Sequence, residues 1–414
     1  MPGSKSYTHR AYLISALLAG GRVKHPLCSE DTNATRELLK GFNCNVKEIE
    51  SGYRIEKKEG LQISGEFFQV GESGTLLRFL IPICTVCEGS GELRIEGSGS
   101  LKERSNKIII DSLQKNDFKI EATGPEKTVP LICYPGQSLP EKPISVAAHT
   151  TSQFLSGWLL ALAAVGGGEI ELSTPLVSAP YVDMTCRVLA EAGAQVNQSS
   201  PGRYSVDASG SRELNYLIPA DYSSAAFFVV GASLTNSSVV LQGLDPDDVQ
   251  GDRRIVDIIS DLGGNVKWTA DGLAISGPFK PAGFEVDAAD CPDLVPVLAV
   301  LASRASGPVK LFNIEHLANK ESDRINMTCR ELKKIGLDIR PGSDCIEINP
   351  QNSKFHSGEV ILKAHNDHRL AMAFSILGLC RGNITVQGAQ CVAKSYPEFY
   401  EDLLGFGATF EKVN

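Results

Sequence analysis

Charged and hydroxyl side chains gather at five places where the 414-residue chain is expected to begin a helix. Each place joins a turn rich in Gly, Ser, Thr, Asn or Pro to an apolar run. A helix begins with free backbone N–H groups and the positive end of the helix dipole, so these places favour anions. The five segments are residues 2–10, 71–78, 150–153, 319–324 and 366–369.

Cations accompany nearly all of these helix starts. The set is Lys5, Arg10, Arg78, Arg104, Lys320, Arg324, Arg369 and Lys394. Solvated surface charge is an equal alternative for Lys5, Arg10 and Arg104 taken singly. The G-x4-G-K-[ST] spacing of a phosphate loop is absent, and no paired His or Cys spacing indicates zinc. The pattern therefore predicts small, highly charged anionic substrates, with no metal and no cofactor.

Carboxylates and hydroxyls supply the possible proton chemistry. Asp293 heads an apolar run, so it is either an N-cap or a partly buried base. Lys320 and Arg324 would share one face of a helix with Glu321 beside them, although a salt-bridged surface explains them equally well. The hydroxyls of residues 150–152 exceed what one N-cap needs and indicate an oxyanion site. A Ser-His-Asp triad through His368 has no G-x-S-x-G motif to support it.

Composition limits the class of protein. The net charge of −9 argues against general nucleic-acid binding. No stretch approaches about 20 uninterrupted apolar residues, and no basic segment precedes a short apolar run at the N-terminus. We therefore expect a soluble, cytoplasmic protein that binds neither nucleic acid nor membrane. The eleven cysteines are scattered, which suits reduced, buried thiols, and core packing is the favoured interpretation for Cys84 and Cys87.

A short sequence motif recurs six times along the chain. It consists of an apolar residue, a Gly, Asn or Asp four positions after it, and another apolar residue three positions after that. The middle residues are Asn43, Asp117, Gly193, Gly263, Gly336 and Gly407, spaced by 70 to 76 positions. These residue types tolerate the left-handed backbone found just past a helix. Each copy therefore predicts a helix end, a tight reversal and the start of a strand.

The repeat implies an α/β architecture of six units, three in each half of the chain. The fourth unit shows the order of elements, with helices over residues 223–234 and 253–262 and strands over 238–241, 266–268 and 273–275. Residues 218–223 form a possible hinge, because Pro219 disfavours helix there. A second apparent hinge lies at residues 2–4. We expect a first domain over residues 5–219 and a second domain over residues 1–4 with 220–414, and ligands bound in a cleft between them.

Taken in order, the motifs resemble the enolpyruvyl transferase family of 5-enolpyruvylshikimate-3-phosphate synthases. The motifs are Pro-Gly-Ser-Lys-Ser at 2–6, Gly-Thr-Leu-Leu-Arg at 74–78, Lys-Glu-Arg at 102–104, Ser-Gln-Phe-Leu at 152–155, Ser-Ala-Pro-Tyr at 178–181, Lys-Glu-Ser-Asp-Arg at 320–324, Asp-His-Arg at 367–369 and Ala-Lys at 393–394. The resemblance implies a two-domain inside-out α/β barrel of six β-α-β-α-β-β units. It also implies transfer of the enolpyruvyl group of phosphoenolpyruvate to the 5-hydroxyl of shikimate 3-phosphate, by a monomer that needs no cofactor.

The resemblance assigns roles to individual residues. The shikimate 3-phosphate side would be held by Lys5, Ser6, Arg10, Thr151, Ser152, Gln153, Ser178, Tyr181, Asp293, His316 and Lys320. Phosphoenolpyruvate would be held by Lys5, Gly74, Arg104, Gln153, Arg324, Arg369 and Lys394. Asp293 would take the proton of the attacking hydroxyl, while Glu321, with Lys5 nearby, would protonate the methylene carbon and later remove that proton.

Some positions depart from the family pattern. Glu72 and His316 each stand where members often have Asn, and Ser105 and Phe79 replace prolines of some members. The chain starts at the Pro-Gly-Ser motif, without the leading strand that members usually have. Gly74 is typical of glyphosate-sensitive members, which makes sensitivity an expectation here.

Three other functions are alternatives, and the sequence argues against each of them. A UDP-N-acetylglucosamine enolpyruvyl transferase would have Asn after its lysine, where this chain has Ser6, and usually carries a reactive loop cysteine that residues 97–130 lack. A non-catalytic anion-binding protein would not need Asp293 and Glu321 together. A phosphate-loop kinase fails on motif spacing.

Overall fold

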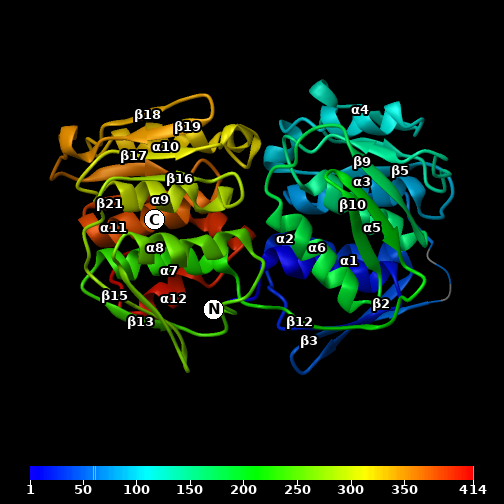
Figure 1. Cartoon of the computed structure of the whole chain (residues 1–414), viewed down its shortest axis with the longest axis horizontal. Coiled ribbons are helices and arrows are strands. Elements are labelled where there is room, and N and C mark those ends of the chain that lie inside the picture. Colours follow the sequence, from blue (N-terminus) through cyan, green and yellow to red (C-terminus); the bar gives the residue numbers. More distant parts are fainter. Residues whose placement is uncertain (59, 61, 414) are drawn as a thin grey trace. The chain divides into compact units, whose positions relative to one another are not determined.

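The computed structural model describes residues 1–58, 60 and 62–413, and the chain divides into two compact units. The N-terminal unit is Gly3–Pro219, and the C-terminal unit is Met1–Pro2 with Ala220–Asn414. Helices and strands alternate in both units, so the fold is mixed α/β (Figure 1). The sequence places the first boundary after residue 4, whereas the contacts place it after Pro2.

Helices form the interior of the N-terminal unit. The helices are α1 (Lys5–Leu17), α2 (Glu30–Leu38), α3 (Gly74–Val86), α4 (Lys107–Lys115), α5 (Gln153–Ala164) and α6 (Pro180–Glu191). Every residue from Tyr7 to Leu17 of α1 and from Phe154 to Ala163 of α5 is buried. A helix that is apolar around its whole circumference must be enclosed on all sides. Gly157 lets α5 approach α3 closely, because a Cβ there would lie 2.8 Å from the Arg78 carbonyl oxygen.

Strands of the N-terminal unit form three sheets among the described residues. Their orders are β12-β1-β3-β2, β4-β5-β7-β6 and β10-β11-β9-β8. In each sheet one edge strand pairs parallel with its neighbour, and the remaining neighbouring strands pair antiparallel. The strands are β1 (Gly21–Lys24), β2 (Cys44–Ile49), β3 (Gly52–Lys57), β4 (Phe67–Gln69), β5 (Leu93–Glu96), β6 (Ile120–Ala122), β7 (Leu131–Cys133), β8 (Ile144–Val146), β9 (Gly167–Leu172), β10 (Gln195–Ser200), β11 (Arg203–Asp207) and β12 (Leu214–Leu217).

The C-terminal unit also buries its helices. The helices are α7 (Tyr222–Leu234), α8 (Arg254–Asp261), α9 (Val295–Ala302), α10 (Arg324–Lys333), α11 (His368–Arg381) and α12 (Phe399–Gly405). All residues of α7 and α9 are buried, and these two helices and α11 pack on one another. Around them lie the sheets β13-β15-β14, β16-β17-β19-β18 and β20-β21. The strands are β13 (Ser238–Leu241), β14 (Asn265–Thr269), β15 (Gly272–Ser276), β16 (Phe284–Asp287), β17 (Val309–Phe312), β18 (Ile339–Pro341), β19 (Cys345–Ile348), β20 (Val360–Lys363) and β21 (Ile384–Gln387).

The six repeated reversals have the backbone that their residue types predict. Asn43, Asp117, Gly193, Gly263, Gly336 and Gly407 all have positive φ, between 57° and 88°. Strands β2, β6, β10, β14 and β18 follow the first five reversals. After Gly407 the described residues 408–413 form no strand, so the sixth copy is incomplete at that point. The sheets stay separate and do not close into one barrel within the described residues.

Most predicted elements of the fourth unit are confirmed. Strand β13 has the expected bounds, and α7 begins one residue earlier than expected. Cys84 and Cys87 are buried free thiols in and just after α3, as core packing predicts. Among the described residues, every helix is too short or too polar to cross a lipid bilayer.

Candidate active site

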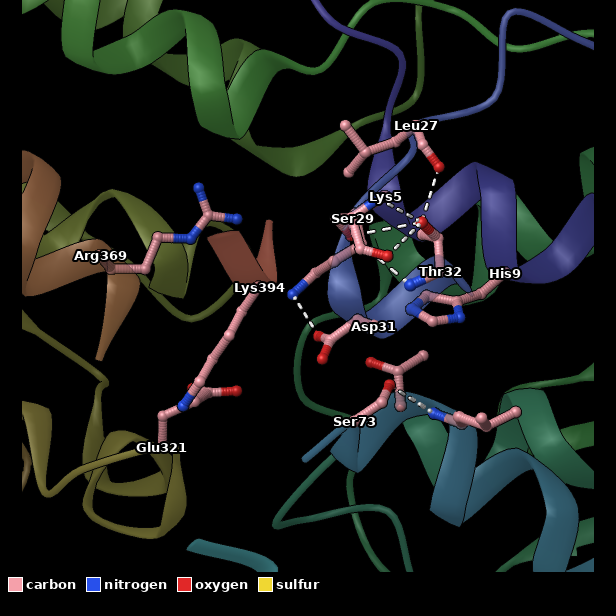
Figure 2. A network of polar contacts seen from close by, with 12 residues as sticks. Lys5, His9, Leu27, Ser29, Asp31, Thr32, Ser73, Glu321, Arg369 and Lys394 are labelled. Carbon is pink, nitrogen blue, oxygen red and sulfur yellow. Dashed lines mark hydrogen bonds and ion pairs between the residues drawn. The ribbon is translucent and has the colours of Figure 1, made fainter. Parts of the chain in front are cut away.

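The first turn of α1 presents Lys5 at its start. The helix begins at Lys5, with Ser4 as the extended N-cap, so segment 2–10, which is expected to lead into a helix, already contains its first turns. Lys5 Nζ lies 3.0 Å from Asp31 Oδ2, and both side chains are mostly buried (Figure 2). Asp31 is not among the residues predicted from the sequence, although two acidic residues at the start of a helix are a recognisable signal.

Asp31 is fixed by the start of α2. Ser29 and Thr32 form a capping box, in which the Ser29 N–H donates to Thr32 Oγ1 at 2.9 Å. The Thr32 hydroxyl also donates to the Leu27 carbonyl oxygen at 2.6 Å (Figure 2). His9 of α1 contacts Thr35 Oγ1 at 2.7 Å through Nδ1. Burial, followed by the charge of Lys5, lowers the pKa of His9 well below its ordinary value, so His9 is neutral at neutral pH.

Arg10 connects α1 to α6 inside the N-terminal unit. Its guanidinium donates to Thr185 Oγ1 at 2.8 Å, to the Tyr181 carbonyl oxygen at 2.7 Å and to the Ser6 carbonyl oxygen at 2.8 Å. The guanidinium also lies 5.0 Å from the centre of the Phe79 ring. Burial lowers the pKa of Arg10 to about 10, which still leaves it charged at neutral pH. The structure thus brings the predicted residues Ser6, Arg10 and Tyr181 together.

Gly74 and Arg104 are in direct contact. Gly74 is the first residue of α3, after the N-cap Ser73, whose Oγ accepts the Leu76 N–H at 3.3 Å (Figure 2). A Cβ on Gly74 would lie 2.9 Å from Arg104 Nη1 and 3.0 Å from Nη2. The missing side chain therefore provides the space that the guanidinium occupies.

Gln153 joins α5 to α3 at their N-terminal ends. Its Oε1 accepts from Arg78 Nη1 at 2.7 Å, and its Nε2 donates to Thr75 Oγ1 at 2.9 Å. The Gln153 N–H donates to Thr151 Oγ1 at 3.2 Å, whereas the side chain of the buried N-cap Ser152 makes no capping bond to α5. The sequence analysis did not include Thr75 among the site residues.

Two further predicted residues lie at the start of α6. Ser178 is buried and has a left-handed backbone, with φ of 54°. Its carbonyl oxygen accepts the Tyr181 N–H at 3.2 Å. Hydrogen bonds thus link α1 to α6 through Arg10, and α3 to α5 through Gln153.

In the C-terminal unit, Arg324 joins three carboxylates. Arg324 Nη1 lies 2.6 Å from Asp293 Oδ1, Nη2 lies 2.8 Å from Glu321 Oε2, and Nε lies 2.8 Å from Asp367 Oδ2. Burial opposes ionisation of Arg324, but Asp367, Glu321 and Asp293 outweigh it and raise the pKa of Arg324 well above its usual value. We call these four residues, with Arg369, the arginine–carboxylate cluster.

Asp293 belongs to the cluster and does not cap a helix. It lies in a 3₁₀ turn, η5 (Pro292–Leu294), before α9, and its carboxylate contacts Arg369 Nη2 at 3.3 Å as well as Arg324. Burial favours the neutral acid, but Arg369 and Arg324 overcome this effect and hold the pKa of Asp293 below its usual range. Asp293 is therefore ionised at neutral pH.

Asp367 orients the start of α11. It is the N-cap of the helix and accepts the Arg369 N–H at 2.9 Å through Oδ1. Its Oδ2 accepts the Ser322 hydroxyl at 3.0 Å besides the bond from Arg324. The Lys394 ammonium donates to the Asn366 carbonyl oxygen at 3.0 Å, immediately before this cap. Asp367 thus connects Arg324 and Arg369 through both its carboxylate oxygens.

The expectation that Lys320 and Arg324 share one helical face was wrong. Lys320 follows the 3₁₀ helix η6 (Glu315–Asn319) in an extended conformation, and α10 begins only at Arg324. Asp323 breaks the run, because its side chain caps α10 by accepting the Asn326 N–H at 3.1 Å. His316 on η6 is buried, and burial, followed by Lys320, lowers its pKa to about 4. His316 is therefore neutral at neutral pH.

Known proteins resemble this chain along nearly its whole length. The family model of EPSP synthase (3-phosphoshikimate 1-carboxyvinyltransferase) matches residues 1–403. Proteins named 3-phosphoshikimate 1-carboxyvinyltransferase from Archaeoglobus fulgidus and Methanococcus maripaludis are 34% and 31% identical. The matches cover 99% and 100% of this chain, and 95% and 96% of those proteins.

Solved structures give the same result. An EPSP synthase from Acinetobacter baumannii superposes with a TM-score of 0.76 at 28% identity, over 98% of this chain and 94% of that one. The enolpyruvyl transferase NikO from Streptomyces tendae, at 17% identity and a TM-score of 0.73, shares the fold. With a family model matching nearly the whole chain and relatives above 30% identity, the chain belongs to the EPSP synthase family, the enzymes that transfer the enolpyruvyl group of phosphoenolpyruvate to shikimate 3-phosphate in aromatic amino-acid biosynthesis.

Proposed function

We propose that the arginine–carboxylate cluster carries the acid–base chemistry of this enolpyruvyl transfer. The observation that supports the proposal most directly is that Asp293 and Glu321 lie on the same buried guanidinium, that of Arg324. One carboxylate serves as base and the other as acid, and Arg324 fixes the position of both. A purely structural salt bridge would need only one such partner.

Asp293 removes the proton of the 5-hydroxyl as its oxygen attacks C2 of phosphoenolpyruvate. An ionised carboxylate is the form that can accept this proton, and the two arginines keep Asp293 ionised. The methylene carbon C3 becomes a methyl group by taking a proton from Glu321. Glu321 then removes one methyl proton, the C2=C3 bond re-forms and phosphate leaves.

The cations hold the substrates and stabilise the leaving phosphate. Arg324, Arg369 and Lys394 of the C-terminal unit, with Lys5, Gly74, Arg104 and Gln153 of the N-terminal unit, bind phosphoenolpyruvate. A substrate anion that takes donors from Arg324 weakens the Arg324–Glu321 bond, and this allows Glu321 to hold a proton. Fixed cations near developing negative charge lower the barrier to phosphate departure.

Shikimate 3-phosphate is assigned mainly to the N-terminal unit. Its proposed contacts are Lys5, Ser6, Arg10, Thr151, Ser152, Gln153, Ser178 and Tyr181, with Asp293, His316 and Lys320 from the C-terminal unit. The hydrogen bonds of Arg10 to α6 and of Gln153 to α3 support this assignment, because they hold these two side chains in place before the ligand binds. The three sheets of each unit likewise support a six-unit organisation, three units to each half.

The function is tested by phosphate release from phosphoenolpyruvate, with shikimate 3-phosphate or UDP-N-acetylglucosamine as acceptor. We expect phosphate release when shikimate 3-phosphate is the acceptor and no release when UDP-N-acetylglucosamine is the acceptor. Activity restricted to the sugar nucleotide would contradict the function. We also expect the active protein to sediment as a monomer.

The roles within the cluster are tested by Asp293→Asn and Glu321→Gln. Each variant should lower kcat by at least about 100-fold, the range typical of a lost general acid or base. Matched controls are Asp287→Asn and Glu315→Gln, because both carboxylates are exposed on neighbouring segments. If the cluster variants keep the kcat of their controls, the acid–base assignment is wrong.

A further inference from the structure

Asp252 is a buried carboxyl group that the reaction scheme above does not use. It lies in the 3₁₀ turn η4 (Gly251–Arg253), which precedes α8, and is 2% exposed. Its Oδ2 accepts a hydrogen bond from the Ser223 hydroxyl of α7. Its Oδ1 accepts no hydrogen bond from the described residues. A buried carboxyl with one neutral hydroxyl partner is unusual in a protein interior.

The surroundings of Asp252 connect it to the arginine–carboxylate cluster. Turn η4 packs against α7 and against η5, which carries Asp293. Arg369 of α11 interacts electrostatically with Asp293, Asp221 and Asp252. Arg369 Nε and Nη1 are buried and donate no hydrogen bond to the described residues, so two of its N–H groups are not held by protein oxygens.

The charges around Asp252 and Asp293 decide which of these two carboxyls holds a proton. Asp293 contacts two arginines, whereas among the described residues Asp252 accepts a hydrogen bond from the Ser223 hydroxyl alone. Burial and the negative charge of Asp293 raise the pKa of Asp252 to about 7, although Arg369 and Ser223 oppose the rise and Asp221 adds to it. Asp252 thus changes charge near neutral pH.

One other titratable group faces Asp252 from η5. Cys291 precedes η5 and interacts with Asp252, and burial raises the pKa of its thiol above its ordinary value. Cys291 is therefore neutral where Asp252 titrates. Arg254, which begins α8, instead lies 3.6 Å from the partly exposed Asp257 on the same helix.

We propose that Asp252 is a positioning residue that controls how much of the charge of Arg369 is available to phosphoenolpyruvate. Neutral Asp252 leaves the guanidinium charge to the substrate anion. Ionised Asp252 neutralises part of that charge from within the C-terminal unit, without touching the substrate. This inference rests on the proposed role of Arg369 in binding phosphoenolpyruvate.

The test compares the KM for phosphoenolpyruvate of the wild type and of Asp252→Asn between pH 6 and pH 8.5. The wild-type KM is divided by the KM of Asp252→Asn, because this ratio cancels the titration of the substrate itself. We expect a ratio near one at pH 6 that rises to about fivefold at pH 8.5, because only the wild type acquires the buried charge. The effect should fall on KM more than on kcat. A ratio that stays constant with pH would overturn the proposal.

Two further variants keep the test decisive. Asp257→Asn, at a partly exposed position on α8, should keep the wild-type profile. Ser223→Ala removes the hydroxyl that favours ionised Asp252, so the inflection in KM should move to higher pH; an unchanged or lower inflection contradicts the proposal even if Asp252→Asn does not fold. Arg369→Gln distinguishes a failure of the Arg369 role from a failure of the Asp252 role. If Arg369→Gln leaves the KM for phosphoenolpyruvate unchanged, the proposed role of Arg369 fails. If it raises this KM while the KM ratio of wild type to Asp252→Asn stays constant with pH, only the role of Asp252 is overturned.

Discussion

Residue types alone identified most members of the candidate site, but not their partners. The spacing of Lys320, Glu321 and Arg324 indicates a charged cluster, yet two of the three carboxylates that contact Arg324 are Asp293 and Asp367, which are 31 and 43 positions away. Such long-range pairs depend on how helix starts assemble in the fold. For the same reason the sequence missed Asp31 and Asp252, whose partners lie on other elements.

Gly74 allows a direct test of the space around Arg104. A methyl group at Gly74 would meet the guanidinium at 2.9 to 3.1 Å, so Arg104 must move. We expect Gly74→Ala to raise the KM for phosphoenolpyruvate about tenfold, equivalent to about 1.4 kcal/mol of lost binding. Steady-state kinetics measure this change. Gly405→Ala is the control, because nothing lies within 4 Å of its added methyl group, and equal KM values for the two variants would contradict the prediction.

Asp252 also predicts how stability depends on pH. Its pKa of about 7 in the folded protein exceeds the unfolded value of about 3.9, so its contribution is complete below pH 4 and is lost as pH rises through 7. Asparagine has no such loss. The melting temperature of Asp252→Asn relative to the wild type should therefore increase from pH 5 to pH 8. A difference that is constant over this range, or that equals that of Asp257→Asn, would count against the assignment.

At the scale of elements, the reversals after helices were the most predictable feature. Left-handed backbone is a local requirement that Gly, Asn and Asp meet at low cost, so six residues were located from sequence alone. The start of α1 was not predictable in this way. Ser4 begins the helix without a side-chain cap bond, and the polar residues 5–10 belong to α1 because packing buries them.

Two of these glycines separate backbone strain from steric contact. Gly336 and Gly263 have nearly identical φ, of 85° and 84°. A Cβ on Gly336 would lie 1.9 Å from the Lys354 carbonyl oxygen, whereas nothing lies within 4 Å of one on Gly263. We expect Gly263→Ala to cost about 1 kcal/mol of unfolding free energy, and Gly336→Ala at least about 2 kcal/mol more. Chemical denaturation measures both, and equal losses would show that the backbone relaxes freely at Gly336.

At the scale of the whole molecule, the sequence indicated a repeat but not how the sheets end. Four sheets share a hairpin with a parallel neighbour, while the sheets β13-β15-β14 and β20-β21 have fewer strands among the described residues. Whether a strand finds a partner depends on segments far away in the chain. Periodicity predicts where strands begin, and it gives no information about which edges are paired.

The two units have separate hydrophobic cores, one formed by residues from Tyr7 to Ile218 and one by residues from Ala220 to Leu403. Chains with several cores commonly depart from two-state unfolding, so we expect two denaturation steps. Gly336→Ala lies in the C-terminal unit. Gly193→Ala is its counterpart in the N-terminal unit, with φ of 84° and a Cβ position 2.2 Å from the Gly210 carbonyl oxygen. Each substitution should lower the midpoint of a different step, measured by urea titration with circular dichroism. If both substitutions shift one common transition equally, the two cores unfold as a single cooperative structure.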